Sequence, residues 1–171
     1  MRRNEGFTLI ELLVVIGIIG ILSALIVPNF RAGDKQFVLQ RSASKLAQDL
    51  RRAEELSMSA KPYPCPSDRK MKGYGINIDI IAGNNYYSLK ARCEKIDNPG
   101  DYSDENAEAL IYLEKGAQIS SPALQSIFFY PPNPVVDLGA LSQVQIVLSL
   151  QNDPAQTKVI TVNKAGLINV Q

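Results

Sequence analysis

The sequence contains no histidine, so the commonest general base and the commonest metal ligand are missing. Catalytic schemes that pair a serine or cysteine nucleophile with histidine are therefore excluded. An excess of charge of one sign is also lacking, because 18 Lys+Arg balance 17 Asp+Glu, a formal net charge of +1. Chains that bind nucleic acid through its phosphates usually have a strong basic surplus. This balance gives no reason to expect a nucleic-acid partner.

Cysteine is scarce: Cys65 and Cys93 are the two in the chain, compatible with one disulfide or with two free thiols. Residues 97–108 are polar and acidic but lack the D-x-D-x-D-G spacing with a closing glutamate that marks a calcium loop. We expect a solvated loop there. With no nucleophile motif and no phosphate loop, the sequence predicts no enzyme, metal site, cofactor or small-molecule substrate.

The longest apolar stretch, residues 7–27, holds one charged residue, Glu11. As an α-helix these 21 residues would span about 31 Å, close to the hydrocarbon core of a bilayer. We therefore expect a polar leader at residues 1–6 and a transmembrane helix at 7–27, with a kink permitted at Pro28. A cleaved secretory signal peptide is the simpler alternative. Its apolar core would be shorter and would not contain an acid.

Glu11 needs an explanation, because a carboxylate at the centre of a membrane helix costs on the order of 3 kcal/mol, and less near an end. Thr8 and Glu11 fit a capping box, in which Glu11 would bind the backbone N–H of Thr8. Alternatively, a cut between Gly6 and Phe7 would create an α-amine at the same membrane depth as Glu11 of a neighbouring helix. The resulting ion pair could be tolerated where a lone acid is penalised. This second hypothesis also explains the sharp boundary between Gly6 and Phe7.

Residues 6–11, GFTLIE, followed by LLVVI, resemble the class III signal of type IV pilins and type II secretion pseudopilins. The resemblance implies that a prepilin peptidase cuts after Gly6 and methylates the new amine of Phe7. It implies that Glu11 takes part in subunit registration in a filament. It further implies a single pass through the bacterial inner membrane, with the N-terminus cytoplasmic and the C-terminal domain exported, and later a place in the filament. The implied partners are the peptidase, other subunits bound through the N-terminal helix, and the inner-membrane assembly platform.

Beyond the apolar stretch, an apolar stripe predicts more helix, to about residue 60, packed on a sheet; it consists of Leu39, Ala43, Leu46, Leu50 and Ala53. The charged run 49–55 is expected to be a solvated face. Three prolines at 62, 64 and 66 end the helix. Period-two alternation then predicts strands at 74–80, 87–93, 143–150, 158–162 and 167–170, with weaker signals at 109–113 and 126–130. The expected fold class is α+β: a pilin fold with an exported helical half at 28–60 and an antiparallel β domain at 61–171.

Export to an oxidising compartment, implied by the resemblance, favours a disulfide between Cys65 and Cys93. Residues 46–53 and 159–168 also resemble the helix and the C-terminal hairpin of H-type minor pseudopilins and their type IV pilus relatives. The predicted function is a minor structural subunit of a type IV pilus-like filament or a type II secretion pseudopilus. The alternative is a minor pilin of a DNA-uptake or adhesive pilus whose exported domain binds a ligand or DNA.

Overall fold

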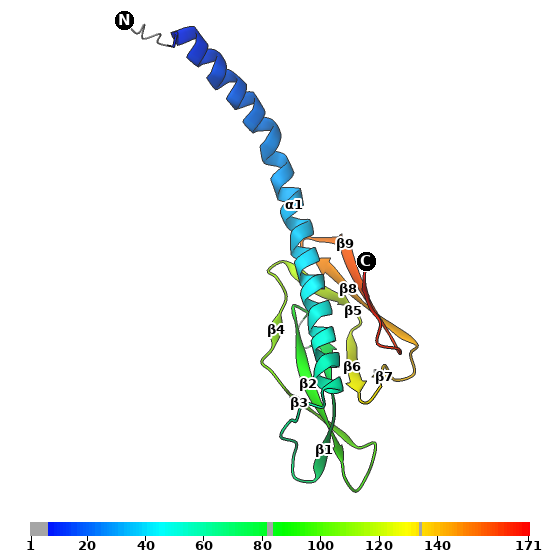
Figure 1. Cartoon of the computed structure of the whole chain (residues 1–171). Helices are drawn as coiled ribbons and strands as arrows, with labels where there is room; N and C mark the ends of the chain where they lie inside the picture. The colour runs from blue at the N-terminus through cyan, green and yellow to red at the C-terminus, as the bar shows by residue number, and fades with distance from the viewer. Residues whose placement is uncertain (1–6, 82–83, 134) are drawn as a thin grey trace, which may run out of the picture. The chain divides into compact units, whose positions relative to one another are not determined.

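The computed structural model describes residues 7–81, 84–133 and 135–171, with side chains for all of these except residues 24–34. Helix α1, Leu9–Met58, is followed by ten strands in the described part of the chain (Figure 1). The chain divides into two compact units, one ending at Phe37 and the other beginning at Val38. Helix α1 contributes residues to both units.

The first unit is the N-terminal part of α1. Its backbone stays helical through Pro28, so the proline does not end the helix. The predicted kink at Pro28 stays a prediction, because its side chain lies outside the described residues. None of the helical segments that the structure describes is both long and apolar enough to cross a membrane. The last four residues of the predicted membrane span 7–27 are residues 24–27. Their side chains also lie outside the described part of the structure.

The second unit has its own hydrophobic core, which begins with the C-terminal part of α1. The stripe predicted from the sequence is confirmed, since its five members, Leu39, Ala43, Leu46, Leu50 and Ala53, are all buried. The helix ends at Met58, two residues before the predicted end. Two backbone bonds close it, from the Lys61 N–H to the Leu56 carbonyl at 3.1 Å and from the Ala60 N–H to the Ser57 carbonyl at 3.0 Å. This is the Schellman arrangement, with Ala60 in the left-handed conformation at φ 47°.

The first sheet is antiparallel and has the strand order β3-β2-β1-β6-β7, with β4 paired to β2 as well. Its strands are β1 (Arg69–Asp79), β2 (Tyr86–Lys95), β3 (Tyr102–Asn106), β4 (Ile111–Tyr112), β6 (Leu124–Tyr130) and β7 (Val135–Asp137). Residues facing α1, such as Ile76 and Phe129, are fully buried.

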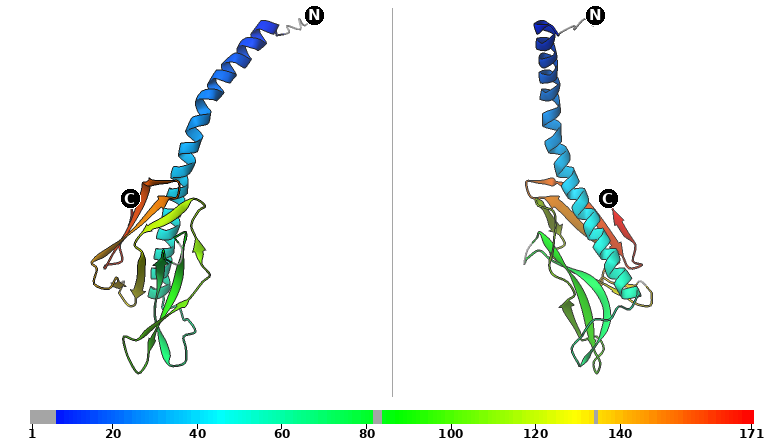
Figure 2. Two further views of the ribbon diagram at one scale, coloured as in Figure 1. Left: turned by 180° about the vertical axis from the view of Figure 1, so that it is seen from behind. Right: turned by 60° about the vertical axis from the view of Figure 1, so that its left-hand side comes forward.

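The second sheet has the strand order β10-β9-β8-β5 and is also antiparallel. Its strands are β5 (Ala117–Ser121), β8 (Gln143–Leu150), β9 (Asp153–Asn163) and β10 (Ile168–Val170). Ile146 and Ile160 from this sheet join Leu46 of α1 and Ile76 of β1 in one core cluster. The views in Figure 2 show both sheets beside the C-terminal part of α1. The predicted α+β fold is confirmed.

The prediction of a solvated loop at 97–108 is wrong for residues 102–106, which form β3. Cross-strand ion pairing explains the difference: Asp104 on β3 lies opposite Arg92 on β2, and their side chains are 2.7 Å apart. The acidic segment therefore pairs with β2 as a strand, which its own composition does not predict. Strands β5 and β7 were also missed.

Candidate functional site

The first turn of α1 brings one predicted site residue, Glu11, together with Thr8. The Thr8 hydroxyl oxygen accepts a hydrogen bond from the Glu11 backbone N–H at 3.3 Å. The same hydroxyl donates to a Glu11 carboxylate oxygen over a long 3.5 Å. Thr8 thus caps the helix, satisfying one of the N–H groups that have no partner within it. The capping-box bond from Glu11 to the Thr8 N–H is not found among the described residues.

The side chains around this turn are exposed on every side of the helix. Phe7 is 83% exposed and Leu9 is 81% exposed. All residues from 7 to 23 are exposed. Glu11 is the one charged residue among them. A helix that is apolar all round is normally buried in a large core or in a membrane. This part of α1 therefore needs an apolar environment or other helices around it.

Two other predicted positions are placed in the second unit. Cys65, in the segment after α1, and Cys93, on β2, form a disulfide with their Cα atoms 5.9 Å apart. The Cys93 side chain is fully buried. The bond ties the proline-containing segment 61–68 to the first sheet. Gly6, on the leader side of the predicted cut, lies outside the described residues.

The acidic segment is held by arginines. Asp101 pairs with Arg69 at 3.0 Å, and Glu108 pairs with Arg52 of α1. No three candidate metal-ligating side chains gather within the part of the chain that the structure describes. Asp101 and Glu108 thus connect the acidic segment to β1 and α1 through ion pairs.

Several cations of β1 and β2 also have acidic partners. Lys72 lies 3.1 Å and Lys70 3.7 Å from the Glu94 carboxylate, and Arg92 contacts both Asp104 and Asp137. Hydrogen bonding from Lys72 lowers the pKa of Glu94, although the burial of this carboxylate opposes the shift. Phosphate-binding surfaces need uncompensated positive charge. These paired side chains do not supply it.

Residues 1–27 match the family model described as the prokaryotic N-terminal methylation motif. The chain carries this motif at its N-terminus. A type IV major pilin protein, PilA, of Myxococcus xanthus is 68% identical over 28 residues, 16% of this chain and 13% of that relative. A type II secretion system core protein G of Dickeya chrysanthemi is 33% identical over 63 residues, covering 37% and 41% of the two chains. A fimbrial protein of Pseudomonas aeruginosa is 32% identical over 78 residues, covering 46% and 51%.

The chain thus spans between about an eighth and a half of the length of these relatives. No solved structure matches it. The N-terminal part of the chain is thus similar to type IV pilins and a type II secretion core protein, and the helix followed by antiparallel sheets is consistent with a pilin fold. The H-type subclass stays a prediction.

Proposed function

We propose that the chain is a minor structural subunit of a type IV pilus-like filament or type II secretion pseudopilus, assembled through the N-terminal part of α1. The observation that carries the proposal is an apolar helical segment exposed on every side from residue 7 to 23, with Glu11 as its one charge. Packing of such segments around one another buries this surface. In a lipid environment, close helix contacts and polar pairs drive the association.

Cleavage after Gly6 is the step that makes the subunit competent for assembly. It gives Phe7 an α-amine, which the same prepilin peptidase methylates. The Glu11 carboxylate has one long contact with the Thr8 hydroxyl and is otherwise exposed, so it remains accessible to a cation from a neighbouring subunit. A close ion pair offsets part of the cost of placing each charge in a low-dielectric environment.

Before assembly the subunit resides in the bacterial inner membrane as a single-pass protein, with the N-terminus in the cytoplasm and the domain exported. The assembly platform of that membrane then extracts it into the filament. The Cys65–Cys93 disulfide supports export to an oxidising compartment, where such bonds persist.

Processing is tested by intact-mass spectrometry of the chain expressed with and without an active prepilin peptidase. With the enzyme, the mass should fall by that of residues 1–6 and rise by one methyl group. A Gly6→Val variant, which places a bulky side chain at the cut, should stay full length. An uncut wild-type N-terminus beside an active peptidase would overturn the proposal.

Assembly is tested by the amount of subunit recovered in sheared filaments. Glu11→Ala should reduce recovery about tenfold, since it removes a charge pair in a low-dielectric setting. Glu11→Gln separates charge from hydrogen bonding, because the amide still reaches Thr8 but carries no charge; it should behave like Glu11→Ala. Leu13→Ala, two residues away in the same exposed segment, is the matched control. Wild-type recovery of Glu11→Ala would remove the role of the charge.

A further inference from the structure

A hollow of about 270 Å³ lies at the C-terminal end of α1, within the second unit. Its walls come from the last turn of α1, the segment that follows, the start of β1, and the residue after β6. Most of the wall is apolar and is formed by Leu56, Pro62, Met71 and Pro131. Pockets for drug-sized ligands usually have about 300–1,000 Å³, whereas an apolar cavity of about 150 Å³ already holds benzene. The hollow therefore has the size for one aromatic side chain.

Hydrogen bonds hold the walls of the hollow in place. The Ser57 hydroxyl accepts a hydrogen bond from the Tyr74 backbone N–H at 2.7 Å and donates one to the Tyr74 carbonyl at 3.4 Å. The Tyr74 phenol donates to the Lys61 carbonyl at 3.2 Å. The disulfide of Cys65 anchors the same segment to β2. Because the hollow is formed in advance, filling it costs little conformational entropy.

Two lysines line the hollow, and they favour an aromatic ring over an anion. Lys72 is 3.1 Å from the Glu94 carboxylate, so its charge is compensated. The Lys61 side chain is exposed and has no partner within the described structure. Ammonium groups are attracted to the faces of aromatic rings, and a methionine sulfur, such as that of Met71, contacts ring edges favourably. A tyrosine suits the hollow best, because its hydroxyl can also accept a hydrogen bond from Lys61.

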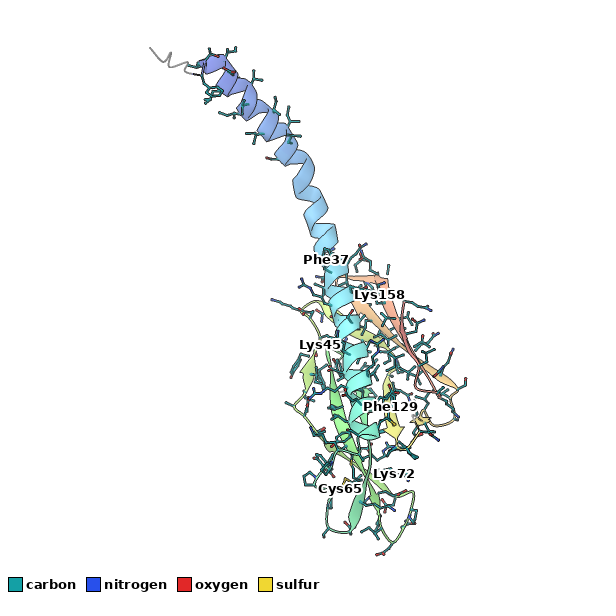
Figure 3. The ribbon with its side chains drawn as sticks, viewed as in Figure 1. Phe37, Lys45, Cys65, Lys72, Phe129 and Lys158 are labelled. Atoms are coloured by element: carbon teal, nitrogen blue, oxygen red, sulfur yellow. A yellow bond between two sulfur atoms is a disulfide. The ribbon has the colours of Figure 1, made fainter. Side chains whose placement is uncertain are left out.

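Tyr112 of β4 is an exposed tyrosine at a different level of the same unit. It is 56% exposed, and its ring lies edge-on to that of Tyr86 with 5.7 Å between the centroids. Its backbone carbonyl accepts a hydrogen bond from Lys45 at 3.0 Å. From Lys45 to Leu56, beside the hollow, α1 rises about 16 Å at 1.5 Å per residue. Lys45 and Lys72, both labelled in Figure 3, mark the two levels. Tyr112 therefore cannot reach the hollow of its own chain.

We propose that the hollow receives the Tyr112 side chain of a second copy of this chain wherever two copies are neighbours. The inference rests on the proposed function, because a filament brings copies together in a fixed register. The two surfaces differ, so the contact is heterologous, and heterologous contacts that do not close a ring build open filaments. Tyr102 suits the role less well, because it is 40% exposed and its ring already lies 5.0 Å from the Arg92 guanidinium carbon.

The contact is tested in the full-length chain by placing the photoreactive residue p-benzoylphenylalanine at position 112. Irradiation of membranes from cells that produce this chain should give a cross-linked dimer. Mass spectrometry of its peptides should place the new bond in the hollow of the second copy, chiefly at Met71, because benzophenones react readily with methionine. The same probe at Gln48, on the exposed side of α1, is the matched control and should not label the hollow.

Substitutions in the hollow test the receiving side. Met71→Trp, which fills the hollow, should lower the dimer yield from position 112 about tenfold. Leu167→Trp, an equally bulky residue at an exposed position between β9 and β10, should leave the yield unchanged. Pro62→Ala removes part of an exposed wall and should lower the yield several-fold, which keeps the test decisive if Met71→Trp disturbs folding. Circular dichroism checks that each variant is folded.

Absence of a dimer from position 112, or a dimer bonded outside the hollow, would overturn the proposal. A bond between the two positions 112 would show a symmetric contact, and capture of a different protein would show another occupant; both results would also overturn it. The measurement requires neither cleavage after Gly6 nor extraction into filaments. A chain that is cut and assembled without this cross-link would refute the inference alone. An uncut chain that gives the cross-link would refute the proposed processing alone.

Discussion

The guanidinium carbon of Arg92 lies 3.7 Å from the centroid of the Phe128 ring. Phe128 is fully buried although it lies on the side of the first sheet away from α1, and its strand partner is Gly75. Arg92 also donates hydrogen bonds to Asp104 and Asp137. Burial lowers the pKa of Arg92, but its hydrogen bonds to Asp104 and Tyr130 outweigh that effect and leave the pKa raised. A charged guanidinium thus covers an aromatic ring and links β2 to β3 and β7.

Arg92→Ala should therefore destabilise the second unit by about 3 kcal/mol, because it uncovers Phe128 and removes the cation that Asp104 and Asp137 share. Urea unfolding of the full chain in detergent micelles measures the effect. Arg51→Ala, an exposed arginine of α1, is the control and should change stability by less than about 0.5 kcal/mol. Equal effects of the two substitutions would mean that the Arg92 contacts contribute nothing.

Gly75→Ala should destabilise by about 1–3 kcal/mol through overpacking. A Cβ at this position would lie 2.6 Å from a ring carbon of Phe128 and would also press on the backbone carbonyl of Ile127, which cannot move aside. Gly17→Ala is the matched control, since its Cβ would meet nothing within 4 Å. The change in thermal unfolding midpoint relative to the wild type should differ in sign or size between the two variants when both are prepared in the same way. A tolerated Gly75→Ala would show that Phe128 can repack.

Ala60→Gly should stabilise the chain by up to about 1 kcal/mol, because a left-handed residue at a helix end is strained with a Cβ and relaxed without one. The same replacement at Ala53, buried within α1, should destabilise by about 1 kcal/mol or more. Opposite signs in chemical denaturation are the expected pattern. Destabilisation at both positions would mean that Ala60 does not keep this conformation in solution.

The disulfide should contribute about 3–4 kcal/mol, the chain-entropy value for a loop of this length. Adding a reductant should lower the denaturation midpoint of the wild type. The double variant Cys65→Ser/Cys93→Ala should start at the lower midpoint and be insensitive to reductant. A reductant effect of equal size in both proteins would point to a cause other than this bond.

Alkaline pH should weaken the fold through Tyr87. Burial raises the pKa of its phenol, and the hydrogen bond to the Asp49 carboxylate at 2.6 Å raises the pKa further. The folded state therefore holds this proton more tightly than the unfolded state. Its stabilisation is complete below the ordinary tyrosine pKa of about 10 and is lost as pH rises above that value.

Tyr87→Phe should consequently lose less stability than the wild type between about pH 9 and pH 11. Some alkaline sensitivity should remain, because burial also raises the pKa of Tyr74 and Tyr130. Unfolding midpoints across this pH range measure the difference. Parallel curves for wild type and variant would exclude Tyr87 as a contributor.

Local periodicity was sufficient to predict α1 and the longer strands. The stripe from Leu39 to Ala53 repeats with the helical period and faces the core, and the alternation around Ile76 and Ile146 marks buried strand faces. Strand β3 could not be predicted in this way. Asp104 of β3 pairs with Arg92, and Asp101, just before β3, pairs with Arg69. Such partners are defined only by the tertiary fold.

In the candidate site, too, contacts within one segment could be predicted from the sequence, whereas contacts between distant segments could not. Thr8, Glu11 and the apolar run are contiguous in the sequence, so the helix start could be predicted from spacing alone. The charged run 49–55 was expected to be solvated, yet Asp49 accepts a hydrogen bond from Tyr87 and Arg52 binds Glu108. Each of these contacts joins residues far apart in the sequence. Spacing within one helix cannot reveal them.

Among the side chains that the structure describes, those of the core of the second unit all belong to residue 38 or later. A single proteolytic cut just before Val38 would therefore remove the exposed apolar helix without taking away any core side chain. The remaining fragment would keep its buried stripe, both sheets and the disulfide. Because the core begins at Val38, proteolysis just before this residue would release the second unit as a folded domain.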